Sequence, residues 1–81
     1  MDEAQIRAVA EPIVARHRAQ ILALVGSADQ VGTDENLRKI ARFVHPLLPL
    51  HLRLMLGRDR LAGMLIDNRD AVVPFLRSKL A

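Results

Sequence analysis

The sequence contains no cysteine, no tryptophan and no tyrosine, and it has only two phenylalanines. Without cysteine there is no disulfide framework and no cysteine-ligated zinc or iron–sulfur centre. Few aromatic side chains are present among the basic residues, so stacking on the bases of a single-stranded nucleic acid is not expected. The chain therefore has to be held together by aliphatic packing.

Long apolar runs and leader segments are also missing. No stretch approaches the roughly 20 apolar residues that a transmembrane helix needs. The first five residues, Met-Asp-Glu-Ala-Gln, are acidic and polar, unlike a signal peptide. We therefore expect a cytoplasmic protein. Arginine supplies ten of the twelve basic residues, a bias typical of GC-rich bacterial genomes.

Sequence motifs of enzymes are absent. There is no Gly-x-Ser-x-Gly, no phosphate-binding glycine loop and no dinucleotide fingerprint, and the only serines are Ser27 and Ser78. No pair of carboxylates stands in an apolar setting that would suit acid–base catalysis. We predict that the protein is not an enzyme, and we infer no catalytic residue, cofactor or small-molecule substrate.

Three histidines are the only candidate nitrogen ligands for a metal ion: His17, His45 and His51. They lack the spacing of a metal site, so we expect a surface position for His17 and helix-end or core-edge positions for the other two. The tetrad Gly32-Thr33-Asp34-Glu35 is similar to the Gly-Thr-Asp-Glu of annexin repeats. This likeness covers four residues only, without the aromatic residues of a repeat, and implies no calcium site.

The most distinctive feature that is present is a leucine-rich segment from Phe43 to Leu56, in which Arg53 is the only full charge. Its second half alternates like a strand, but leucine and methionine favour helix and β-branched residues are missing there. We predict a helix, with a strand as the alternative. Pro46 should end the preceding helix, and Pro49 should lie in the first turn of the new one.

In that helix, Leu47, Leu50 and Leu54, with His51 beside them, fit a buried face.

Helical spacing continues on both sides of this segment. An apolar stripe runs from residue 6 to Val25, and Pro12 within it predicts a break or a strong kink. The stripe consists of Ile6, Val9, Ile13, Ile21 and Leu24. Gly26 suits the end of this helical region, and the Ser27–Gln30 pair has the form of a capping box.

Thr33 is the stronger N-cap, and the helix after it places four apolar residues on one side: Leu37, Ile40, Ala41 and Val44. Beyond Gly57 a further helix is expected, and then a last one capped by Asn68 or Asp70 with Pro74 near its first turn. The prediction is an all-α protein, a compact bundle or orthogonal array of four to six short helices, with residues 1–81 forming a single small domain.

Hydrophobic residues make up 51% of the chain without counting glycine, more than so small a domain easily buries. We therefore expect a protein–protein interaction module, homo-oligomeric and most simply a homodimer, or one that binds a helical protein partner. The expected contact surface is part of the leucine-rich segment: Phe43, Leu47, Leu48, Leu52, Met55 and Leu56.

A cluster of basic residues supports a first alternative, a nucleic-acid-binding accessory protein. Its predicted patch is made by Arg16, Arg18, Arg38, Lys39 and Arg42. The net charge of +3 is small for that role, and the leucine-rich helix does not suit a DNA groove. A second alternative is a peripheral membrane protein, because arginines border the leucine-rich segment.

Overall fold

The computed structural model describes residues 3–81, apart from the side chains of Glu3 and Ile6. Within that range it has six α-helices, two short 3₁₀ turns and no strand, which confirms the all-α prediction. The helices are α1 (Glu3–Arg16), α2 (Arg18–Val25), α3 (Asp34–Val44), α4 (Leu50–Met55), α5 (Arg58–Asp67) and α6 (Arg69–Leu80). The 3₁₀ turns are η1 (Ala28–Gln30) and η2 (His45–Leu47).

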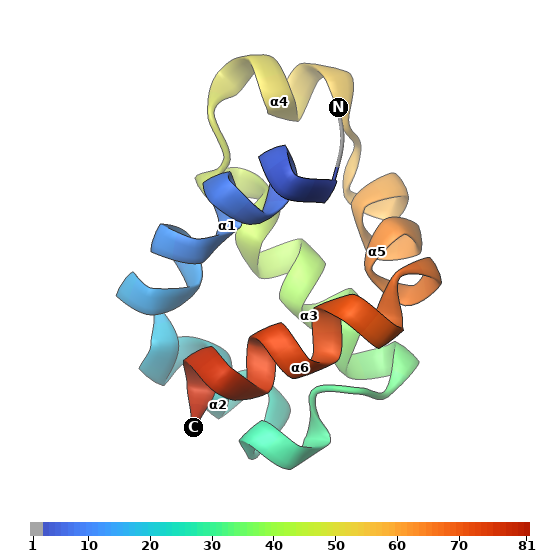
Figure 1. Cartoon of the computed structure of the whole chain (residues 1–81). Helices are drawn as coiled ribbons and strands as arrows, with labels where there is room; N and C mark the ends of the chain where they lie inside the picture. The colour runs from blue at the N-terminus through green and yellow to red at the C-terminus, as the bar shows by residue number, and fades with distance from the viewer. Residues whose placement is uncertain (1–2) are drawn as a thin grey trace.

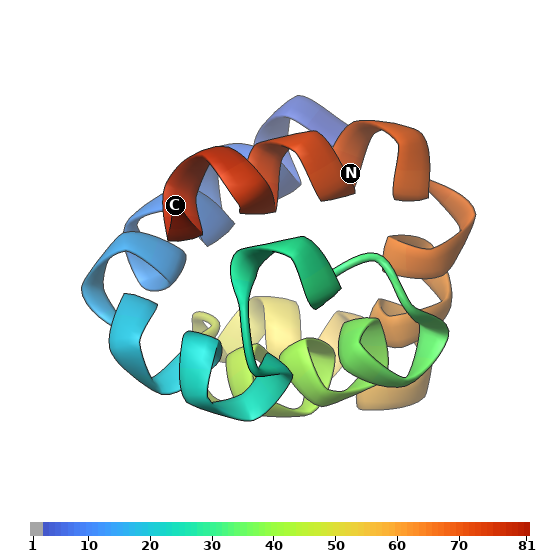
Figure 2. The same ribbon diagram turned by 90° about the horizontal axis from the view of Figure 1, so that it is seen from below.

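Helix α3 lies at the centre of the arrangement. It packs most extensively against α5 and next against α2. Helices α1 and α6 are in contact with each other (Figures 1 and 2). The Cα radius of gyration is 11.3 Å. A compact 81-residue domain is expected near 12 Å, so the chain closes around one core.

Two prolines lie inside helices, and the break predicted at Pro12 is not formed. Helix α1 continues through Pro12 without a break, and the interruption comes at His17, between α1 and α2. Pro74 lies in the second turn of α6 rather than near its start. Both prolines are solvent-exposed. There, water can satisfy the carbonyl group that loses its helical hydrogen bond, so the helices tolerate them.

Helix ends follow the predicted chemistry in two cases. Gly26 adopts φ +92° after α2, and its N–H donates to the Leu22 carbonyl at 2.8 Å. Thr33 accepts a hydrogen bond on Oγ1 from the Asn36 N–H at 3.1 Å, as an N-cap should. Two expected caps are not formed. Ser27 makes no side-chain cap bond. Asn68 precedes α6, but its side chain donates back to the Met64 carbonyl.

The core is aliphatic and centred on the predicted face of α3, where all four apolar residues are buried. In the stripe of α1 and α2, Ile21 is buried and Val9 and Ile13 are half-buried, whereas Leu24 is 39% exposed; Ile6 lies outside the described side chains. Among the described residues, no helix is long and apolar enough to cross a bilayer.

Candidate functional site

Four large apolar side chains are exposed on and beside α4, and we call them the α4 patch: Leu47, Leu50, Leu54 and Met55. Their exposed fractions are 40%, 62%, 79% and 67%. Among the described residues, the only other large hydrophobic side chain exposed to this degree is Leu24. Scattered exposed leucines are ordinary in proteins, but four large apolar side chains exposed within residues 47–55 are typical of an interaction surface.

The orientation of α4 reverses part of the sequence prediction. The helix is formed, but Leu48, Leu52 and Leu56 face inward, with exposed fractions of 6–9%. Leu47, Leu50 and Leu54, expected on the buried face with His51, are exposed, and so is His51. A leucine-rich segment has two helical stripes of similar hydrophobicity, so packing decides which one is buried.

Of the six residues predicted for the contact surface, some are therefore buried and others exposed. Leu48, Leu52 and Leu56 belong to the core and do not lie on the surface. Phe43 is half-buried, and its ring meets the His17 ring edge-on at 5.6 Å. Only Leu47 and Met55 of the six are exposed. The sequence prediction of the contact surface missed Leu50 and Leu54, although these two residues are four positions apart and share one face of α4.

Helix α4 is attached by its inner side chains and its ends. It has six residues, and no side chain caps its N-terminus, where Pro49 precedes it. At its other end, Nε2 of His45 donates to the Leu56 carbonyl at 2.7 Å, which ties the end of α4 to the end of α3. In Figure 1, α4 stands apart from the rest of the ribbon. This places the α4 patch on a projecting part of the molecule.

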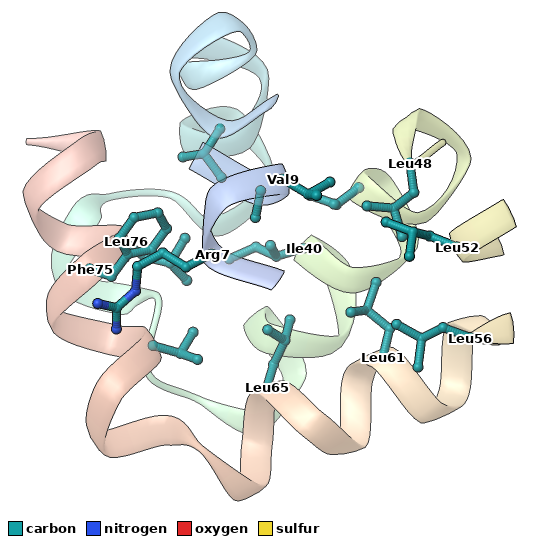
Figure 3. A pocket seen from close by; sticks show the side chains of 14 residues that line it. Arg7, Val9, Ile40, Leu48, Leu52, Leu56, Leu61, Leu65, Phe75 and Leu76 are labelled. Carbon is teal, nitrogen blue, oxygen red and sulfur yellow. The ribbon is translucent and has the colours of Figure 1, made fainter. Parts of the chain in front are cut away.

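An apolar cavity of about 90 Å³ lies beneath α4. Figure 3 shows Leu48, Leu52 and Leu56 on one side of it, with Leu61 beside Leu56, and Phe75 and Leu76 on the opposite side. The only charged residue in its lining is Arg7, whose guanidinium group lies 5.5 Å from the centre of the Phe75 ring. Apart from Arg7 the walls are apolar and hold no group suited to acid–base chemistry, and we assign the cavity to core packing.

The histidines have structural partners or face solvent. His17 is half-buried rather than on the surface, and its Nδ1 donates to the Ile13 carbonyl at 3.0 Å. His45 lies at the end of α3, as expected, and His51 is exposed on α4. The described side chains contain no group of three histidine, aspartate or glutamate residues able to hold a metal ion.

Two of the five residues predicted for the basic patch have partners elsewhere in the fold. Lys39 pairs with Glu35 at 3.6 Å, and Arg18 donates to the Ala81 carbonyl at 2.9 Å. Arg16 is exposed at the end of α1. Only Arg38 and Arg42 share a site, and there they are joined by a residue that sequence spacing missed, Arg58.

These three arginines line a groove between α3 and α5, which we call the arginine groove. It has a volume of about 260 Å³ and also includes Asp59, Ala62, Gly63 and Ile66. Arg38 and Arg42 are one turn apart on α3, and Arg58 begins α5 directly after Gly57. The tight packing of α3 on α5 brings them together, which is a contact that periodicity within one helix does not predict.

Charge is segregated around both features. Residues 36–58 contain five basic residues and no acidic one: Arg38, Lys39, Arg42, Arg53 and Arg58. All nine acidic residues lie before or after this range. The α4 patch and the three arginines of the groove thus belong to a positively charged part of the chain, whereas Asp59 and the other lining residues follow it.

Comparisons with models of protein families, with curated proteins and with solved structures find no match to this chain. Its function therefore has to be argued from its own surface.

Proposed function

We propose that the protein is a small, non-enzymatic interaction module that associates with a second copy of itself through the α4 patch. The observation that carries this proposal is the exposure of four large apolar side chains, three on α4 and Leu47 on the turn before it. A two-fold axis beside α4 would place the same four side chains of each copy against one another. Such an arrangement removes apolar surface that the single chain leaves in water.

The size of the patch sets the expected strength of association. Its exposed fractions are equivalent to roughly two and a half fully exposed side chains per copy, each of which contributes about 1.5–3 kcal/mol when buried. Two copies would thus gain about 7–15 kcal/mol in total. Association costs an estimated 4–15 kcal/mol. This cost offsets much of the gain, so we expect a weak dimer, and a Kd on the order of 10 µM to 1 mM sets the range to be searched.

Arginine side chains fit at the edge of this contact. Arg53 is exposed on α4 between Leu50 and Leu54. Its aliphatic stem can cover apolar surface while the guanidinium group stays in water. A second copy brings a second Arg53, and the resulting repulsion is modest because both groups remain solvated.

Sedimentation velocity between about 10 µM and 1 mM tests the proposal directly. The wild-type protein should shift from monomer to dimer across this range. The double variant Leu50→Gln/Leu54→Gln should remain monomeric, because an amide at these positions loses the apolar contact. Since both side chains face solvent in the monomer, the helical circular dichroism signal should be unchanged.

Leu24→Gln is the matched control, because Leu24 is also a partly exposed leucine but lies on α2, outside the patch. It should dimerise like the wild type. A wild-type protein that is still monomeric at 1 mM, or a double variant that dimerises equally well, contradicts the proposal.

A peripheral membrane role is the second candidate, and the charge segregation favours it. The α4 patch lies in a range with five basic residues and no acidic one, and apolar side chains among arginines suit an anionic bilayer surface. Sedimentation with phosphatidylserine-containing vesicles separates the two roles. Under the membrane role, the protein binds anionic vesicles, does not bind neutral ones, and stays monomeric without lipid.

A further inference from the structure

We infer that the arginine groove binds a diphosphate group, as found on small phosphorylated molecules. The inference rests on the three arginines that α3 and α5 bring together, and it does not depend on the α4 patch. Arginine is the side chain best suited to phosphate oxygens, since its planar guanidinium group donates two parallel hydrogen bonds.

The three guanidinium groups have no partner of opposite charge among the described residues. The ion pairs found there join Lys39 to Glu35, Arg69 to Asp34 and Lys79 to Glu11, and none includes Arg38, Arg42 or Arg58. Arg16, Arg53, Arg60 and Arg77 are also exposed and absent from these ion pairs, but only Arg38, Arg42 and Arg58 line one groove together. The groove thus gathers positive charge that an anion would neutralise.

The dimensions of the groove favour two phosphates over one. Arg38 and Arg42 are four residues apart, or about 6 Å along the axis of α3. They can therefore contact different phosphates of one ligand while Arg58 approaches from α5. The volume of about 260 Å³ is far above the roughly 10–15 Å³ that a single bound water needs, so the groove has room for a ligand larger than one phosphate ion.

The floor of the groove is open. A Cβ atom built on Gly63 meets no other atom within 4 Å, so the glycine leaves space in the groove that packing does not require. Ala62 and Ile66 beside it offer a small apolar wall for the organic part of a ligand. Neither residue competes with the arginines for the anion.

Asp59 places a negative charge in the arginine groove, and removing that charge tests whether electrostatic attraction holds the diphosphate. Its carboxylate lies in the same groove and repels phosphate. If the site works by charge, Asp59→Asn should tighten diphosphate binding about threefold, because it removes one negative charge without changing shape. A ligand with a hydroxyl group beside the diphosphate could instead donate to this carboxylate.

Nuclear magnetic resonance titration of the ¹⁵N-labelled protein with inorganic diphosphate, at constant ionic strength, tests the inference. We expect saturable shifts at residues 38–42 and 58–63, with a Kd on the order of 1 mM or tighter and weaker binding of inorganic phosphate. Arg42→Ala/Arg58→Ala should weaken binding about tenfold or more. Both side chains are exposed and unpaired within the described range, so this variant should keep the wild-type spectrum elsewhere.

Arg16→Ala/Arg77→Ala removes the same charge outside the groove and should bind diphosphate as the wild type does. Equal binding by both double variants would show that only net charge matters and would overturn the inference. So would the absence of saturation at about 10 mM diphosphate. A DNA duplex that binds more tightly than diphosphate and shifts Arg16 and Arg18 as well would replace the inferred site with a nucleic-acid surface.

Discussion

At the start of α3, a single hydroxyl group supplies the hydrogen-bond acceptor that a backbone N–H would otherwise lack. Oγ1 of Thr33 accepts from the Asn36 N–H at 3.1 Å, and the Asn36 side chain in turn donates to the Gln30 carbonyl at 2.5 Å. Asn36 is the only buried polar residue among those described. These bonds fix the loop before the central helix.

Thr33→Ala should lower the free energy of unfolding by about 1 kcal/mol, because the N-cap bond is lost and nothing replaces it. A domain of this size would then melt about 4–8 °C lower. Thr33→Ser keeps the hydroxyl group and should remain within about 0.5 kcal/mol of the wild type. Urea unfolding followed by circular dichroism measures both. Equal losses in the two variants would mean that the methyl group, not the cap, matters.

Two glycines should respond to alanine in opposite directions. Gly63→Ala should stabilise the protein by about 0.5–1 kcal/mol, since the position is helical and the new Cβ atom meets nothing within 4 Å. Gly26→Ala should destabilise it by about 1–2 kcal/mol, because φ is +92° there. Thermal melts of the two variants provide the comparison. A stabilising Gly26→Ala would place the end of α2 in a different conformation.

At the scale of elements, the sequence predicted kinds of structure better than orientations. The spacing of Leu37, Ile40, Ala41 and Val44 identified the buried face of α3 because polar residues occupy its other side. The leucine-rich segment has no such contrast. Leu48, Leu52 and Leu56 make one helical stripe, and Leu50 with Leu54 makes another. The choice between them depends on packing against α3 and α5, most of whose residues lie outside the segment, and on the His45–Leu56 hydrogen bond, which forms only once the chain is folded.

The candidate sites show the same division. Sequence reasoning found Arg38 and Arg42, which share one helix face, but it missed Arg58, which comes from another helix. It also extended the basic patch to Arg18, which instead binds the C-terminal carbonyl. Side chains on one helix follow from its period, whereas groups brought together by packing between helices do not.

The orientation of α4 gives a direct prediction. Leu52→Ala should cost about 2–5 kcal/mol, because the side chain is 6% exposed and fills the core. Leu54→Ala, at 79% exposure, should change stability by no more than about 0.5 kcal/mol. In a strand, positions 52 and 54 would share one face and respond alike. Chemical denaturation of the two variants therefore tests both the helix and its orientation.

At the scale of the whole molecule, the segregation of charge weakens one proposed contact, the dimer, and strengthens the other, the binding of diphosphate. In a dimer formed through the α4 patch, the positively charged ranges 36–58 of two copies approach each other. In the arginine groove, the same range meets an anion. Salt screens both interactions, and the screening length falls from about 30 Å at 0.01 M to about 8 Å at 0.15 M.

Raising sodium chloride from about 10 mM to 150 mM should therefore tighten the dimer, by about threefold, and weaken diphosphate binding by at least as much. Sedimentation velocity and nuclear magnetic resonance titration measure the two constants on the same protein. Lys79, on α6 and paired with Glu11 of α1 at 2.6 Å, lies outside both contacts, so Lys79→Gln serves as a charge control that should leave both salt responses intact. A dimer that dissociates as salt rises would be held by opposite charges rather than by the apolar side chains of α4, and the contact surface would then have to include acidic residues from outside the range 36–58.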